Sequence, residues 1–210
     1  MATHRFAPTH YHRAIGAHEP VLRIAPGDTI ITTTLDAGGG NERGERVSPG
    51  GNPQTGPFYI EGAEPGDTLA VRFDAIRLNR DTGYTATVLA ENVVDPAYVR
   101  ELPQPETIIW DIDHAGNTAT PRLDSPRLAG LKLPLAPMLG CFGVAPPRGQ
   151  AISTAASAEH GGNMDYKGFA AGVTVYLPVF VPGALFHLGD CHAVQGAGEI
   201  VGTGIEISSE

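Results

Sequence analysis

The segment from Gly183 to Glu206 concentrates residue types that could do chemistry. Asp190 and His192 lie two positions apart at the end of an apolar alternation, so an extended backbone would point both side chains to the same side. Carboxylate oxygen and imidazole nitrogen together suit zinc or another first-row divalent metal, and either group can act as an acid or a base. The alternative is a tight hairpin in which both side chains bond only to backbone amides.

A further carboxylate, Glu199, follows His192 by seven positions in the same segment. It comes after two glycines and before Ile200 and Val201, which predicts that it projects into the same space as Asp190 and His192. We expect Glu199 to act as the general base, with Glu64 as a second candidate for this role and His192 as a further catalytic group.

A second polar block, E-H-G-G-N-M-D, ends at Asp165. Its two glycines, Gly161 and Gly162, leave the backbone free to expose the neighbouring side chains and to offer N–H groups to an oxyanion. We predict a metal site formed by His160, Asp190 and Asp36. The alternative interpretation of this block is a plain surface loop.

Asp36 opens a polar, glycine-rich stretch, residues 36–58, which is too long for an ordinary connection and therefore indicates a functional loop. We expect substrate to be bound by Gly161, Gly162, Asn163 and Gln195.

Short strands must position these groups. Pro-Gly-Asp precedes a β-branched run at residues 26–28 and again at 65–67, which is the composition of a type II turn leading into a strand. Further strand-like runs occupy 84–94, 106–112 and the apolar stretch from Val173 to Phe186, and amphipathic helices are almost absent. The prediction is a mainly β protein, built as a sandwich or barrel with few short helices.

Composition narrows the class of protein. The chain has 210 residues, 41% of them hydrophobic, which suffices for one core over residues 1–210 or for two packed β subdomains, about 1–125 and 126–210. A net charge of −9 without a basic cluster disfavours nucleic acid or an anionic membrane as a partner. Cys141 and Cys191 have no disulfide or zinc-motif spacing, and no signal or membrane-spanning run is visible, so we expect a cytoplasmic protein.

The order of motifs resembles the acetamidase/formamidase family. The resemblance rests on Asp36 followed by N-P-Q-T-G-P-F-Y-I-E-G-A-E-P-G-D-T-L, then G-C-F-G-V-A-P, then E-H-G-G-N-M-D, then the run ending in G-D-C-H-A-V-Q-G-A-G-E-I. It covers the chain from about Val21 onward. Several long matches in one order are far more specific than a single glycine motif.

This resemblance implies a cytoplasmic homo-oligomer, a dimer in the simplest case, that hydrolyses short aliphatic amides on a β-rich fold. The clustered ligands lead us to expect a divalent metal, zinc first and calcium second, although a metal-free carboxylate site is the alternative. Cys191 replaces the usual glycine of the family, which disfavours it as a nucleophile.

Two departures favour an alternative function. Ala197 stands where many relatives carry aspartate, and the chain resembles a short variant that lacks the usual C-terminal portion. Both features would suit a non-catalytic relative that binds a small amide without hydrolysing it. In a purely structural protein, by contrast, the polar residues would not gather in three blocks.

Overall fold

The computed structural model describes residues 1–87 and 89–210. Strands dominate, and the helical segments of these residues are single 3₁₀ turns: η1 (Glu91–Val93), η2 (Val99–Glu101), η3 (Pro126–Leu128), η4 (Pro147–Gly149) and η5 (Ala197–Glu199). The predicted mainly β fold with few short helices is therefore confirmed. Across the described residues no helix is both long and apolar enough to span a membrane.

The largest sheet has six strands in the order β13–β14–β11–β16–β5–β3. Neighbouring strands are antiparallel except for β3 and β5, which run parallel. The sheet consists of β3 (Leu22–Ile24), β5 (Thr55–Ile60), β11 (Met138–Gly143), β13 (Ser157–Ala158), β14 (Gly161–Asn163) and β16 (Phe186–His192). Because β16 pairs with β5, residues more than a hundred positions apart in the sequence become neighbours in this sheet.

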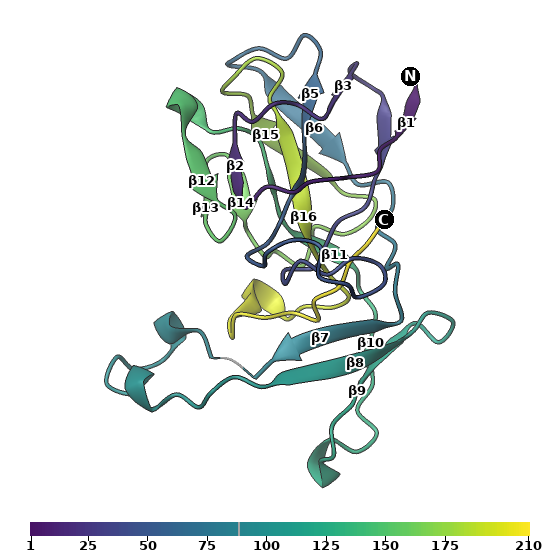
Figure 1. Ribbon diagram of the computed structural model, residues 1–210, viewed down its shortest axis with the longest axis vertical. Helices are drawn as coiled ribbons and strands as arrows, with labels where there is room; N and C mark the ends of the chain where they lie inside the picture. The colour runs from purple at the N-terminus through teal and green to yellow at the C-terminus, as the bar shows by residue number, and fades with distance from the viewer. Residues whose placement is uncertain (88) are drawn as a thin grey trace.

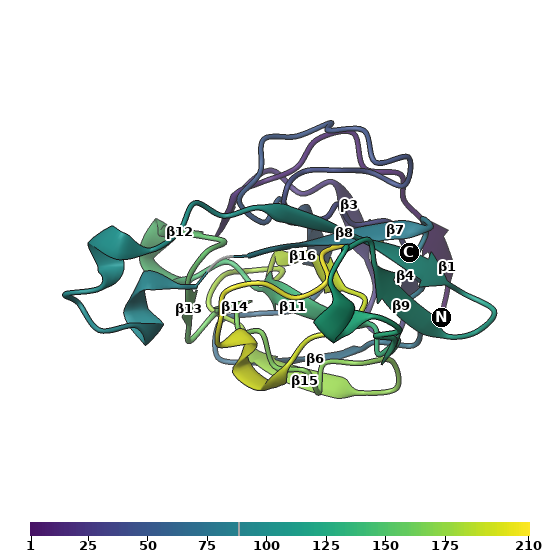
Figure 2. The same cartoon turned by 90° about the horizontal axis from the view of Figure 1, so that it is seen from below.

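A four-stranded antiparallel sheet lies beneath this body in Figure 1. It has the order β10–β9–β8–β7 and comprises β7 (Thr82–Ala86), β8 (Thr107–Asp113), β9 (Thr118–Pro121) and β10 (Leu133–Pro134). The turns η1 and η2 project to one side of it in both Figure 1 and Figure 2.

Three strand pairs complete the fold. The pair β1–β4 is parallel, and the pairs β2–β12 and β6–β15 are antiparallel. Their bounds are β1 (Thr3–Arg5), β4 (Thr29–Ile31), β2 (Ala14–Gly16), β12 (Ala151–Ser153), β6 (Thr68–Arg72) and β15 (Thr174–Pro178).

Both predicted Pro-Gly-Asp turns are confirmed. Gly27 and Gly66 have φ of 88° and 100°, the left-handed conformation that the third residue of a type II turn requires. The Asp28 amide donates to the Ala25 carbonyl and the Asp67 amide to the Glu64 carbonyl, which closes each turn before β4 and β6.

Two expected strands are shorter than their apolar runs. The run 84–94 is a strand only through the end of β7 at Ala86 and later forms η1; Val88 lies outside the described residues. The run from Val173 to Phe186 divides into β15 and the start of β16, because Pro178 and Pro182 cannot donate to a strand ladder. The run 106–112 corresponds closely to β8.

The hydrophobic core surrounds β11, which is buried at all six positions. The Phe142 ring is fully buried and packs edge-on against the rings of Phe73 and Phe169, with centroids 5.0 and 4.8 Å apart. Its neighbour β16 is also buried except at Leu188. Polar side chains on these two strands are therefore enclosed by the core.

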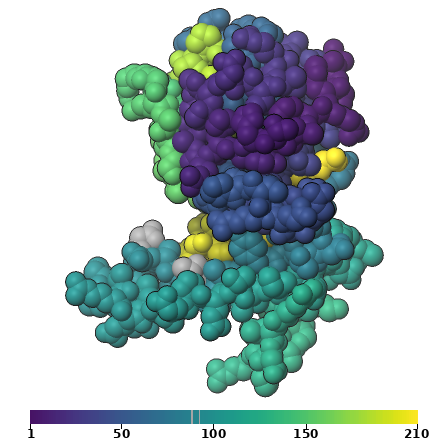
Figure 3. All heavy atoms as spheres, viewed as in Figure 1, coloured from purple at the N-terminus to yellow at the C-terminus, as the bar shows by residue number. Residues whose placement is uncertain are grey.

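The predicted functional loop, residues 36–58, ends earlier than expected, because residues 55–58 already belong to β5. It lies between the N-terminal part and the four-stranded sheet, where Figure 3 shows it as a blue band. Its last residues return toward β16, where Asn52 donates to Asp190.

Candidate active site

Strand β16 carries Asp190 and His192 into a buried position. Their exposed fractions are 2% and 1%, and Oδ1 of Asp190 lies 3.5 Å from Nε2 of His192. Both residues belong to the strand rather than to a turn after it, and Met138 of β11 lies opposite His192. Asp190 has φ of 58°, so the strand departs from regular geometry at this carboxylate.

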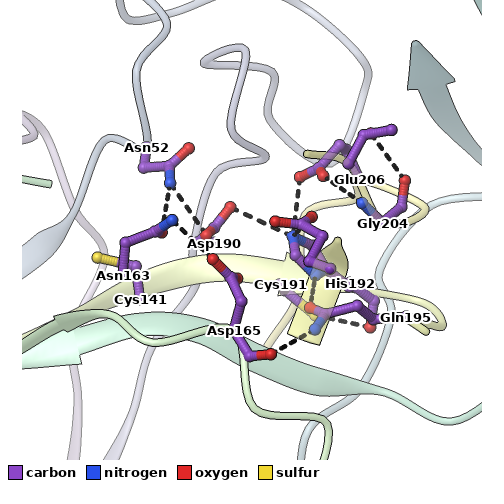
Figure 4. A network of polar contacts seen from close by, with 12 residues as sticks. Asn52, Cys141, Asn163, Asp165, Asp190, Cys191, His192, Gln195, Gly204 and Glu206 are labelled. Carbon is purple, nitrogen blue, oxygen red and sulfur yellow. Dashed lines mark hydrogen bonds and ion pairs between the residues drawn. The ribbon is translucent and has the colours of Figure 1, made fainter. Parts of the chain in front are cut away.

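Two glutamates approach the same imidazole from later in the chain, and Figure 4 labels one of them, Glu206. Oε2 of Glu206 is 3.1 Å from His192 Nε2, and Oε1 of Glu199, from η5, is 3.7 Å away. Glu206 stands between Ile205 and Ile207 and forms isolated bridges with Tyr84 and His192. Three carboxylates therefore surround one ring nitrogen.

The other ring nitrogen of His192 is bound by Gln195. Nε2 of Gln195 donates to the Asp165 carbonyl, which can only accept, so Oε1 of Gln195 faces His192 Nδ1 at 2.6 Å. His192 must then carry a proton on Nδ1 and direct Nε2 toward the carboxylates (Figure 4). Gln195, expected to bind substrate, uses both ends of its amide inside the protein.

Two side-chain amides, those of Asn52 and Asn163, hold the carboxylates of Asp190 and Asp165. Nδ2 of Asn52 donates to Oδ2 of Asp190 at 3.0 Å and to Oδ1 of Asn163 at 2.7 Å. Nδ2 of Asn163 in turn donates to Oδ2 of Asp165 at 2.6 Å (Figure 4). Asn163, also expected to bind substrate, orients a carboxylate in this structure.

The cluster formed by Asp165, Asp190, His192, Glu199 and Glu206 is short of positive charge and of hydrogen bonds. Oδ1 of Asp165, Oδ1 of Asp190 and Oε2 of Glu206 are buried and have no hydrogen-bond partner among residues 1–87 and 89–210. The last two have only their ion-pair distances to His192 Nε2. Buried carboxylate oxygens without a donor or a cation are costly, so the arrangement favours a cation or a proton at this position.

The pKa values of the cluster reflect this crowding. Burial, together with the neighbouring carboxylates, raises the pKa of Asp165 to about 6 and that of Glu199 to about 8. Burial also raises the pKa of Glu206. Burial alone would lower the pKa of His192, but the carboxylates of Glu206 and Asp190 hold it well above its usual value.

Two ligand sets overlap at His192. Donor atoms of Asp165, Asp190 and His192 lie within 4.8 Å of one another, and so do those of His192, Glu199 and Glu206. Mixed imidazole and carboxylate ligands of this kind suit zinc and related divalent metals.

Three residues predicted for the site lie outside this cluster. Asp36 is buried but accepts from Arg80 Nη1 at 2.6 Å and from the Gly40 amide at 2.8 Å, so its charge is already paired. His160 is fully buried, and neither of its ring nitrogens has a partner in the described part of the chain. Glu64 lies exposed in the turn between β5 and β6. The predicted ligand set of Asp36, His160 and Asp190 is therefore not assembled.

Gly161 and Gly162 have a structural reason to be glycine. Both lie in β14 with φ near 95°, and a Cβ at Gly161 would lie 2.6 Å from the Phe142 carbonyl, while one at Gly162 would clash with the Ala156 carbonyl. This close approach of strands requires glycine without any ligand.

The two cysteines are buried and free. Burial raises the pKa of Cys191 to about 12 and that of Cys141 well above its usual value, so neither thiol forms a reactive thiolate near neutral pH.

Sequence reasoning did not select Asn52, Asp165 or Glu206 as site residues. Asp165 ends the E-H-G-G-N-M-D block, and Glu206 is an acidic residue between two isoleucines, which is a recognisable sign of a buried carboxylate. Asn52 could be suspected only from its place in the glycine-rich loop.

The acetamidase/formamidase family model matches residues 8–149 and 148–210, so the chain belongs to the acetamidase/formamidase family. A solved acetamidase structure from Bacillus halodurans superposes with a TM-score of 0.79 at 34% identity, covering 98% of this chain and 67% of that one.

Relatives of this family include a formamidase of Methylophilus methylotrophus, 25% identical over 86% of this chain, and an acetamidase of Mycolicibacterium smegmatis, 27% identical over 70% of it. The matches cover 56% and 48% of those two proteins, so the chain spans about half the length of these relatives.

Proposed function

We propose that this protein hydrolyses small linear amides of the formamide and acetamide type to a carboxylic acid and ammonia. The observation that carries the proposal is the buried cluster around His192, in which three carboxylate oxygens lack a hydrogen-bond partner among the described residues. Membership of the acetamidase/formamidase family gives the reaction class.

A divalent metal, zinc in the first instance, fits the donor set of the cluster. We assign Asp165, Asp190 and His192 as its ligands, with Glu206 next to them, in place of the set predicted from sequence. A metal held there would polarise an amide carbonyl and make a nearby water more acidic.

The chain's own residues hold and move the proton. Gln195 keeps His192 Nε2 directed into the cluster, while Asn52 and Asn163 keep Asp190 and Asp165 in place. The side chain of Glu199 is 12% exposed, against 1% for His192 and 3% for Asp190, so it is the more accessible to an entering substrate. With a cation bound in the cluster, the raised pKa of Glu199 would fall and leave it ionised, so that Glu199 would take a proton from the attacking water and pass it to the leaving nitrogen. A C–O bond forms, the C–N bond breaks, and ammonia leaves.

Ammonia release from formamide, acetamide and propionamide tests the proposal. We expect release with zinc-loaded protein, and we expect a chelator to abolish it and added zinc to restore it. Zinc-loaded protein that binds these amides but releases no ammonia would instead support the alternative of a binding relative. Ala197, exposed in η5, is the observation that favours this alternative, because the family resemblance leads us to expect aspartate at this position.

Gly140→Ala should disturb the metal ligands. A Cβ at Gly140, on β11, would lie 2.8 Å from Oδ2 of Asp190 and would clash with Oδ1 of Asp165. We expect weaker zinc binding and a loss of about 1–3 kcal/mol of stability from overpacking. Zinc titration and thermal unfolding measure both.

Gly196→Ala is the matched control for Gly140→Ala. A Cβ at Gly196 meets no atom within 4 Å, and its φ of −69° suits alanine. It should change stability by no more than about 0.5 kcal/mol. Equal zinc affinity in the Gly140 variant and the wild type would contradict the assigned ligands.

We also propose a cytoplasmic homo-oligomer, a dimer in the simplest case. Among the described strands β15 pairs with β6 alone, and Tyr176 on β15 is 70% exposed. An open edge of this kind favours pairing with a second copy. Light scattering at micromolar concentration measures the state, and a monodisperse monomer would count against it.

A further inference from the structure

A cluster of histidines lies apart from the carboxylates. His12 and His18, on either side of β2, stack with ring centroids 4.0 Å apart and an interplanar angle of 8°. The ring of His187, from β16, meets both edge-on, with centroids 5.8 Å from His12 and 5.7 Å from His18. These three of the chain's eight histidines thus share one small volume.

Backbone hydrogen bonds set the tautomers of two of these rings. Nε2 of His18 lies 2.9 Å from the Ala14 carbonyl, and Nε2 of His187 lies 3.1 Å from the Gly16 carbonyl. A carbonyl only accepts, so both Nε2 atoms carry hydrogen, and the lone pair of either ring in its neutral form lies on Nδ1. Metal-binding histidines are held in this manner, with the non-ligating nitrogen donating to a backbone carbonyl.

The lone pairs of the cluster are unused. Nδ1 of His187, a residue with no exposed surface, and Nε2 of His12 are both buried without a hydrogen-bond partner in the described structure. Burial lowers the pKa of His187 to about 3 and that of His12 to about 4, so both rings are neutral near pH 7. Neutral imidazole is the form that binds metals.

The cluster borders a cavity of about 480 Å³, lined in part by His12, His18 and Ser153. This cavity is a path by which an ion could enter. In their described positions the three free nitrogens do not all lie within 4.8 Å of one another, so one ring must turn to bring them together. We take His12 to be this ring, because its Nε2 has no hydrogen bond to break and the residue lines the cavity; the turn would replace its stacking on His18 by metal ligation.

We propose that His12, His18 and His187 form a second metal site, which binds a divalent transition metal through imidazole nitrogens only. A ligand set without carboxylates suits zinc, copper or nickel and disfavours calcium and magnesium. Binding would tie the N-terminal segment to β16. It would also fix the backbone pairing of His12 with Gln54, two residues from Asn52, which holds Asp190.

Zinc binding to four proteins tests the second site: the wild type, the double variant His12→Asn with His18→Asn, Asp190→Asn, and His114→Asn. Equilibrium dialysis followed by metal analysis gives zinc per chain. We expect the double variant to bind one zinc fewer than the wild type, or to bind it at least about tenfold more weakly. Asp190→Asn should keep this zinc, which separates the second site from the proposed active site. His114, an exposed histidine outside the cluster, is the matched control and should leave zinc binding unchanged.

A second measurement needs no variant. Paramagnetic Co²⁺ added to the wild type should broaden the ring signals of His12, His18 and His187 in NMR spectra and leave those of His114 sharp. A double variant that binds as much zinc as the wild type, or Co²⁺ that leaves the three rings unaffected, would overturn the proposal.

Discussion

Glu199→Gln is expected to lower the turnover of formamide and acetamide by about 10²- to 10⁴-fold, the usual contribution of a general base. The amide has nearly the volume of the carboxylate but cannot take a proton from water. Glu199 lies 3.7 Å from His192 Nε2 at the more exposed side of the cluster, so fold and zinc content should be preserved. Ammonia release, melting temperature and zinc per chain measure the three effects.

Glu64→Gln is the matched control for the same chemical change. Glu64 was a second candidate base from sequence, but it lies exposed on the turn between β5 and β6. We expect its replacement to leave turnover unchanged. Undiminished activity of the Glu199 variant would rule out the role assigned to Glu199, and a large loss in the Glu64 variant would return the role to that residue.

Asp190→Asn is expected to remove the metal proposed for the active site without harming the metal-free fold. Loss of an outer-shell partner typically weakens metal binding about 10- to 100-fold, and loss of a ligand should cost at least as much. In the presence of a chelator the melting temperature should not fall, because the change removes one of several buried like charges and retains an oxygen to accept from Asn52.

Asp36→Asn is expected to have the opposite effects, a loss of stability without a loss of zinc affinity. Asp36 forms a buried ion pair with Arg80, so its replacement leaves a buried guanidinium without its partner and should cost about 3–5 kcal/mol of stability. Zinc affinity of the surviving folded protein should be unchanged. Wild-type zinc affinity in the Asp190 variant, combined with lost affinity in the Asp36 variant, would contradict the assigned ligands and support the set predicted from sequence.

Local patterns in the sequence were sufficient for the mainly β fold and for its turns. Gly27 and Gly66 adopt positive φ because glycine alone does so at little cost, and this preference is readable without a structure. The i, i+2 spacing likewise placed Asp190 and His192 side by side, since side chains alternate along any strand. Glu199 follows His192 by only seven positions, so it could be assigned to the same site from the sequence.

Contacts between residues far apart in the sequence decided the partners of the buried charged residues. Asp36 and Glu206 are both buried carboxylates, yet one meets Arg80 and the other meets His192, and neither partner can be identified from neighbouring residues. Asn52 reaches Asp190 across 138 positions. Sequence alone determined which residues could do chemistry and the strands that carry them. Only the tertiary structure decided which carboxylates are already paired with a cation and which remain free to bind one. The pairing depends on contacts between segments far apart in the sequence, and the packing of the sheets sets which of these segments meet.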